Sequence, residues 1–207
     1  MYIENKSTKR KSKKIYKTIQ EFLLKLPLEI KNILNRYNTL ITITNIKNDL
    51  QYETEYVGCY LMEFNKNKPI AHIYISETND INKVANVLSH EIGHLLDQVL
   101  GCFYNKVNIS KENIKNYPLS LTHDEITLFI KKESDFFTQI KRTISTEIDL
   151  LIEKYDLQEE FANCVAQVLT NTSKSRFPVT KNTLAEVFSE FNKDNFNVFK
   201  IPLVAVL

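Results

Sequence analysis

The sequence predicts an α+β domain in which helices outnumber the strands of a small mixed sheet. Residues 39–46, TLITITNI, are rich in β-branched residues and alternate apolar and polar side chains, a pattern typical of a strand. Two further β-rich runs, 56–64 and 70–76, flank NKNKP and predict a β-hairpin. Helical periodicity precedes this sheet and dominates after it, so the predicted order is helix, sheet, helices.

Three of the predicted helices have a recognisable start or stop. Pro27 opens the second helix, because proline is favoured at the first helical position. Gly101 is expected to end the third helix. Thr122 and Glu125 form a capping box for the fourth. The expected helices cover about 12–25, 27–37, 79–101, 123–154 with breaks, 157–170 and 180–193.

Composition narrows the classes of protein to which this chain can belong. The chain has 207 residues, 43% of them hydrophobic, which is enough for one well-buried domain. The net charge of +2 does not call for a nucleic-acid partner. The basic run from Lys6 to Lys17 is expected to be a solvated arm leading into a helix. Three scattered cysteines, Cys59, Cys102 and Cys164, are expected to be reduced thiols.

No apolar run of signal-peptide length follows the basic start MYIENKSTKRKSKK. No stretch has the length and apolarity of a membrane span. We therefore expect neither an export signal nor a transmembrane segment in the sequence as written. That sequence fits a cytoplasmic monomer, although its localisation stays open.

The segment VLSHEIGHLLD contains His90, Glu91 and His94. On a helix, two histidines four residues apart project from the same face, so both imidazoles can reach one ion. Glu91 lies about 100° around the helix, beside the ion rather than on it. This is the H-E-x-x-H arrangement of zinc peptidases, in which the glutamate is the general base.

The residues around this motif also favour a helix with two distinct faces. Gly93 stands in mid-helix, where glycine costs about 1 kcal/mol relative to alanine. Its presence indicates that another part of the chain passes close to the backbone. The side of the helix opposite the two histidines carries an apolar stripe formed by Ile81, Val84, Ala85, Leu88, Ile92, Leu95 and Val99.

A catalytic zinc site needs three protein ligands and one open position. The third candidate is Glu159, in the segment DLQEEFANCVAQVL. Its helical face also carries Ala162, Asn163 and Ala166, and small residues there would let two helices approach closely. Glu160 is the alternative ligand.

These motifs resemble the gluzincin zinc peptidases, and most closely the anthrax-lethal-factor-like branch, which includes the clostridial Pro-Pro endopeptidases. HEIGHLLD, ESDFFTQI, EEFANCVA and SKSRFPVTKNTLAEVF carry the likeness, which covers roughly residues 56–195. The resemblance implies a zincin-like metallopeptidase domain at 38–207, preceded by a basic arm and helices at 1–37. It also implies that Asp97 orients a liganding histidine and that the enzyme is a toxin-like or virulence-like bacterial protease.

Two features depart from that branch. Residues 102–122 look like an insertion that lengthens the gap between His94 and Glu159. The branch places an oxyanion-stabilising tyrosine seven residues before its glutamate ligand, where this chain has Ile152. Tyr155 is the nearest substitute and is expected to take that role.

A second family, the ImmA/IrrE-like regulatory peptidases that cleave repressors, shares HEIGH and an E-x-x-A-N helix. Asn163 fits this family and is expected beside the ligands. A non-catalytic zinc-binding module is the remaining alternative. His72 and His123 are expected to be structural.

The expected enzyme is a zinc endopeptidase with one Zn²⁺ per chain and a protein or peptide as substrate. Nucleic acid is not expected as a partner. Pro69 suggests that the 70–76 strand lies at the sheet edge, where an extended substrate would pair with it.

Overall fold

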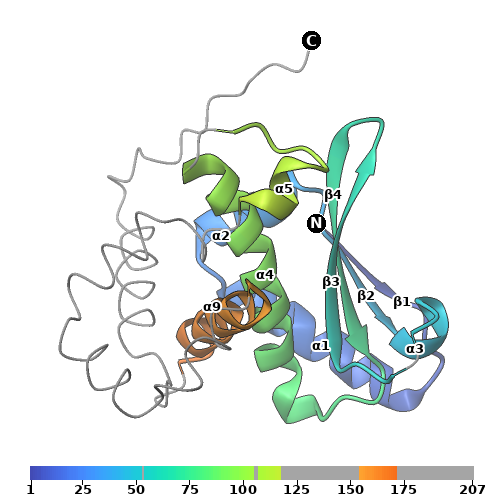
Figure 1. Cartoon of the computed structure of the whole chain (residues 1–207). Helices are drawn as coiled ribbons and strands as arrows, with labels where there is room; N and C mark the ends of the chain where they lie inside the picture. Colours follow the sequence, from blue (N-terminus) through green and yellow to red (C-terminus); the bar gives the residue numbers. More distant parts are fainter. Residues whose placement is uncertain (53, 105–106, 118–153, 172–207) are drawn as a thin grey trace, which may run out of the picture.

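The computed structural model describes residues 1–52, 54–104, 107–117 and 154–171 (Figure 1). This part of the chain is a mixture of helices and a four-stranded mixed sheet, which agrees with the predicted α+β class. The helices are α1 (Arg10–Lys25), α2 (Leu28–Arg36), α3 (Ile46–Asp49), α4 (Val84–Tyr104), α5 (Asn113–Asn116) and α9 (Lys154–Leu169), with a 3-10 turn at Ile81–Lys83 before α4.

The sheet has the strand order β1-β2-β4-β3. β1 and β2 are parallel, as are β2 and β4, whereas β3 and β4 form the expected antiparallel hairpin. β1 was not expected, because a four-residue run with two polar members carries little strand signal. The strands are β1 (Tyr2–Asn5), β2 (Leu40–Thr44), β3 (Gly58–Asn65) and β4 (Lys68–Ser76).

The prediction that the 70–76 strand forms the sheet edge is wrong. β4 lies between β2 and β3, and β3 is the edge strand on that side. Pro69 is nevertheless placed as proline requires, because β2 pairs with β4 only from His72 onward. Pro69 pairs with Phe64 alone, in the part of the hairpin that extends past β2.

Gly101 does not end the long helix, as α4 continues to Tyr104. No described glycine has a positive φ, so Gly101 lacks the left-handed conformation of a glycine cap. The side chain of Cys102 is fully buried, so the helix still has a packed face beyond the glycine. The helices expected at 123–154 and 180–193, with Thr122, His123 and Glu125, lie outside the described residues except for the last residue of the first range.

α4 is the central helix of the fold. It packs against β3, β4 and α1, and α9 lies along it (Figure 1). The predicted apolar stripe is confirmed, because Val84, Leu88, Ile92, Leu95 and Val99 are buried. Each such side chain contributes about 1.5–3 kcal/mol when fully buried, so this face holds α4 firmly in place.

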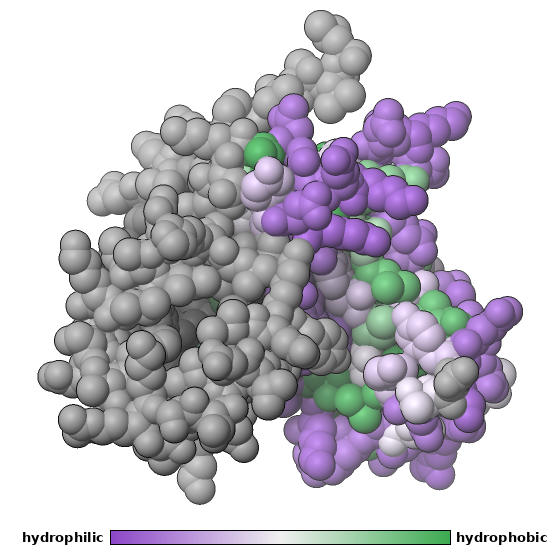
Figure 2. Space-filling view, viewed as in Figure 1, coloured by the Kyte–Doolittle hydropathy of each residue, from purple (hydrophilic) through white to green (hydrophobic). Residues whose placement is uncertain are grey.

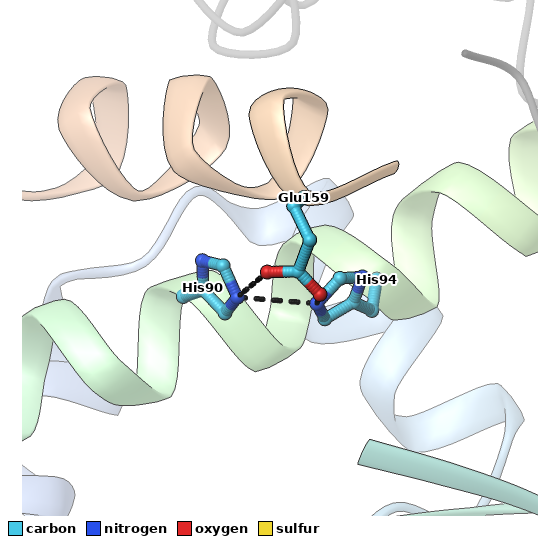
Figure 3. Close-up of side chains that lie close together, drawn as sticks. All are labelled: His90, His94 and Glu159. Carbon is cyan, nitrogen blue, oxygen red and sulfur yellow. Dashed lines mark hydrogen bonds and ion pairs between the residues drawn. The ribbon is translucent and has the colours of Figure 1, made fainter. Parts of the chain in front are cut away.

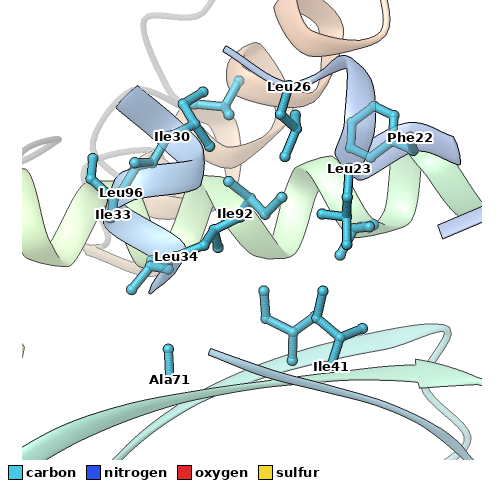
Figure 4. Packing of buried hydrophobic residues seen from close by; sticks show 14 of the residues in the cluster. Phe22, Leu23, Leu26, Ile30, Ile33, Leu34, Ile41, Ala71, Ile92 and Leu96 are labelled. Atoms are coloured by element: carbon cyan, nitrogen blue, oxygen red, sulfur yellow. The ribbon is translucent and has the colours of Figure 1, made fainter. Parts of the chain in front are cut away.

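The same hydrophobic core includes residues from α1, α2, β2, β4 and α9 (Figure 4). Ile30 and Leu34 of α2 and Ile41 of β2 are fully buried in it. The first 37 residues therefore supply part of the core on which α4 rests. On the face seen in Figure 2, the described hydrophobic residues form small separate patches between hydrophilic ones.

The basic run from Lys6 to Lys17 is not a solvated arm, because α1 already begins at Arg10 and two lysines of the run bind the loop after β4. The Lys9 ammonium donates a hydrogen bond to the Glu77 carboxylate, and Lys11 Nζ donates to the Thr78 carbonyl at 2.8 Å. The contact with Lys9, helped by Ser7, holds the pKa of Glu77 below its usual value. The amino-terminal segment is thereby attached to the sheet by charge as well as by β1.

Candidate metal centre

His90 and His94 lie one turn apart near the middle of α4, and their rings meet edge to face (Figure 3). The ring centroids are 4.7 Å apart with an interplanar angle of 88°. Their Nε2 atoms are separated by 3.1 Å. The predicted helix thus directs one nitrogen from each histidine to a common point.

Glu159 reaches the same point from α9. Its Oε2 is 3.2 Å from His90 Nε2, and its Oε1 is 3.4 Å from His94 Nε2. The carboxylate therefore spans the two imidazoles, as Figure 3 shows. The side chain of Glu160, the alternative ligand, lies outside the described residues.

The close approach of α4 and α9 depends on Gly93. A Cβ at this position would lie 2.6 Å from the Ala162 Cα and 3.1 Å from the Ala162 Cβ. Real Cβ atoms do not come so close to backbone, so no larger residue fits without moving a helix. The expectation that the chain passes close to Gly93 is confirmed, and the small residue opposite is one of those on the face of Glu159.

The three side chains can hold a metal ion. Their nearest ligand atoms all lie within 4.8 Å of one another. Two ligands bound at about 2.0–2.1 Å to a tetrahedral ion are roughly 3.3 Å apart. The 3.1 Å between the two Nε2 atoms is close to that value, and different oxygens of Glu159 lie 3.2 Å from His90 Nε2 and 3.4 Å from His94 Nε2. Two imidazoles with one carboxylate are ligands that zinc accepts.

Asn163 holds one of the histidines in the tautomer that binds metal. His90 Nδ1 donates to Asn163 Oδ1 at 3.0 Å. With its hydrogen on Nδ1, a neutral imidazole presents the lone pair of Nε2, which is the atom beside Glu159. Asn163 therefore lies beside the ligands, as expected from the sequence.

The charges within the group are mutually stabilising. Hydrogen bonds to His90 and His94 hold the pKa of Glu159 far below its usual value. Burial alone would lower the pKa of His90, but Glu159, Glu91 and Asn163 outweigh burial and raise it. Without an ion, Glu159 is thus a carboxylate that attracts positive charge to the space between the two rings.

Glu91 lies next to this group and not within it. Its side chain is 6% exposed, and burial raises its pKa to about 7 against the opposing effect of His90 and His94. It packs beside Val87 and against Gly58 of β3. The site therefore holds a buried carboxyl that both binds and releases a proton near neutral pH.

The structure describes the other expected site residues only in part. Asp97 is 1% exposed on α4, and its role in orienting a histidine stays a prediction. Tyr155 lies in the first turn of α9, but its side chain, like the whole of Ile152, is outside the described residues. The role of Tyr155 also stays a prediction.

His72 lies apart from the metal group. It lies on β4, with Nε2 3.6 Å from Glu63 Oε2 and Nδ1 3.4 Å from the Tyr74 hydroxyl. These contacts are typical of a structural histidine.

Sequence reasoning did not single out Gly58, which contacts Glu91 from the edge strand. A glycine within a strand pattern often marks a close approach, and this was the available signal. The partner that approaches it is visible only in the folded chain.

No protein-family model and no curated protein sequence matches this chain. In the part of the chain that the structure describes, no helix has both the length and the apolarity to span a bilayer.

Proposed function

We propose that this protein is a zinc-dependent endopeptidase with a zincin-like domain. The observation that carries the proposal is the meeting of His90, His94 and Glu159 at ligand distances beside the buried Glu91. A structural zinc site has four protein ligands and no need of a base, whereas three ligands leave one position for water. The donor set and the neighbouring carboxyl together favour hydrolysis.

When bound, the zinc ion would act as a Lewis acid that lowers the pKa of water to about 7 and polarises the peptide carbonyl. Glu91 would accept the proton from the attacking water and deliver it to the amide nitrogen as the C–N bond breaks. Burial raises the pKa of Glu91 in the metal-free chain, and the charge of a bound zinc ion would lower it toward the carboxylate that accepts the proton. Asn163 would keep His90 oriented, and Tyr155 would stabilise the oxyanion.

The substrate would be a protein or peptide in extended form. β3 is the edge strand and contacts Glu91 at Gly58, so it replaces the 70–76 strand as the proposed pairing surface. The sequence motifs favour a toxin-like enzyme of the lethal-factor-like branch. The Asn163 contact keeps an ImmA/IrrE-like regulatory peptidase as the second candidate.

The first experiment is elemental analysis of the purified chain after loading with zinc at neutral pH. Wild type and His72→Ala should hold one equivalent, while His94→Ala and Glu159→Ala should lose it. His72→Ala is the matched control, because His72 lies outside the ligand group. A wild-type chain that holds no zinc would sink the proposal, and retention in Glu159→Ala alone would point to Glu160.

The second experiment tests hydrolysis with a quenched-fluorescent peptide library. Glu91→Gln keeps the shape of the side chain and removes the base, so kcat should fall about 10²- to 10⁴-fold with zinc still bound. Zinc binding without any cleavage by the wild type would instead favour a non-catalytic zinc-binding module.

A further inference from the structure

We propose that Gly58 is a positioning residue for Glu91: the missing side chain at the start of β3 keeps open the space that the Glu91 carboxyl group occupies. The inference rests on the proposed function, since it concerns the group assigned as general base. It adds a residue of the edge strand to the site.

The steric evidence is direct. A Cβ at position 58 would overlap Glu91 Oε1 and lie 3.1 Å from Glu91 Cδ. It would also lie 2.6 Å from Val87 Cγ1. Val87 and Glu91 are one turn apart on α4, so the glycine faces a continuous strip of that helix.

Backbone conformation does not explain the glycine. No described glycine has a positive φ, so position 58 adopts a conformation open to any residue. Gly58 pairs with Ile75 in the regular antiparallel register. What the position requires is the absence of a side chain.

The strand cannot easily move back to relieve an overlap. On one side of Gly58, the Val57 carbonyl accepts hydrogen bonds from Ser76 N at 3.0 Å and from Asn79 Nδ2 at 2.6 Å. On the other side, the Tyr60 hydroxyl donates to Gln98 Oε1 of α4 at 3.0 Å. With both flanks fixed, the flexible end of the Glu91 side chain is the part that would give way.

Displacement of this carboxyl matters because of where Glu91 stands. It adjoins His90 in sequence, and its buried side chain packs against β3, so few other positions are open to its carboxyl oxygens. An added methyl group would turn them away from their present position. A general base acts only within hydrogen-bond reach of the proton it takes, so a small displacement lowers kcat.

The test is a double-mutant cycle of Gly58→Ala and Glu91→Ala, with zinc content, Tm and kcat as readouts. The kinetic probe is the peptide that wild type cleaves fastest in the library. Gly58→Ala should keep one equivalent of zinc and a KM within about threefold, and lose at least about tenfold in kcat. In the Glu91→Ala background, Gly58→Ala should leave the residual rate unchanged.

Tm provides a readout that needs no activity. Gly58→Ala should lower Tm by roughly 3–10 °C. The fall should be clearly smaller in the Glu91→Ala background, where the overlap with Glu91 is removed and only the close approach to Val87 Cγ1 remains. Glu91→Gln keeps the bulk of the side chain, so the full fall should return in that background. Cys59→Ala, at the next residue of the strand, is the control for Tm and should leave it close to wild type.

Three outcomes would overturn the inference. They are a wild-type kcat in Gly58→Ala, a loss of kcat that is equal in both backgrounds, and a fall in Tm that does not depend on Glu91. If wild type cleaves no peptide while Tm still shows the coupling, the contact between Gly58 and Glu91 stands and the proposed function fails.

Discussion

At the scale of single residues, the site depends on which atoms carry hydrogen. His90 presents Nε2 toward Glu159 because its Nδ1 hydrogen is held by the Asn163 amide oxygen. Such partners of metal-binding histidines fix the ring and its tautomer. Asn163 should therefore affect metal affinity without binding the ion.

Asn163→Ala should weaken zinc binding about 10- to 100-fold, because His90 loses the acceptor that fixes its tautomer. Asn163→Asp keeps an acceptor oxygen at the same place and should retain most of the affinity. Competition with a chromophoric chelator at neutral pH measures both variants. Equal affinity in Asn163→Ala and wild type would show that the hydrogen bond does not support the ligand.

At the scale of elements, the centre exists because two helices touch at a glycine. Gly93 and Glu91 are two residues apart, about 200° around α4, so one faces α9 and the other β3. Helix propensity alone predicts that Gly93→Ala would stabilise the chain by about 1 kcal/mol. The contact with backbone atoms of Ala162 predicts the opposite.

Gly93→Ala should lower stability by about 1–3 kcal/mol, since overpacking outweighs the gain in helix propensity. It should also weaken zinc binding, because separating α9 from α4 withdraws Glu159 from the histidines. Thermal unfolding and zinc titration measure the two effects. A variant with higher Tm and unchanged affinity would show that the helices need no glycine here.

The elements also show how much of the fold could be predicted from the sequence. Periodicity placed α1, α2, β2, the hairpin, α4 and α9 within a few residues, because each buries a regular apolar face. The ligand set followed from helical spacing, since residues on one face share a target. Strand order did not follow, and neither β1 nor the edge position of β3 has a local signal. The contact of Gly58 with Glu91 joins two elements, so it could not be predicted from local sequence either.

At the scale of the whole molecule, the amino-terminal segment is tied to the loop after β4. The pKa of Glu77 is depressed by Lys9, so the pair stabilises the folded chain above the unfolded pKa of about 4.3. That contribution disappears as pH falls through the lower folded pKa. Lys9 is 58% exposed, so the pair is worth at most about 1 kcal/mol.

Lys9→Met should lower Tm at pH 7 by roughly 2–4 °C at most, and this difference from wild type should shrink as pH falls below the unfolded pKa of about 4.3. Lys13→Met removes the same charge from an exposed position of α1 and is the control. Thermal scans from pH 3 to pH 7 make the comparison. A difference as large at pH 3 as at pH 7 would show that Lys9 acts by some other means.

The three ligands come from two helices that are distant in sequence, with His94 on α4 and Glu159 on α9. An ion held by both helices would act as a removable cross-link around the chain between them. Because the ion is released when the chain unfolds, it would stabilise the folded state by mass action, by about 2.7 kcal/mol at a free-ion concentration 100 times its Kd. If the centre binds zinc as proposed, the ion would thus also stabilise the fold, and the metal-free chain would unfold at a lower temperature.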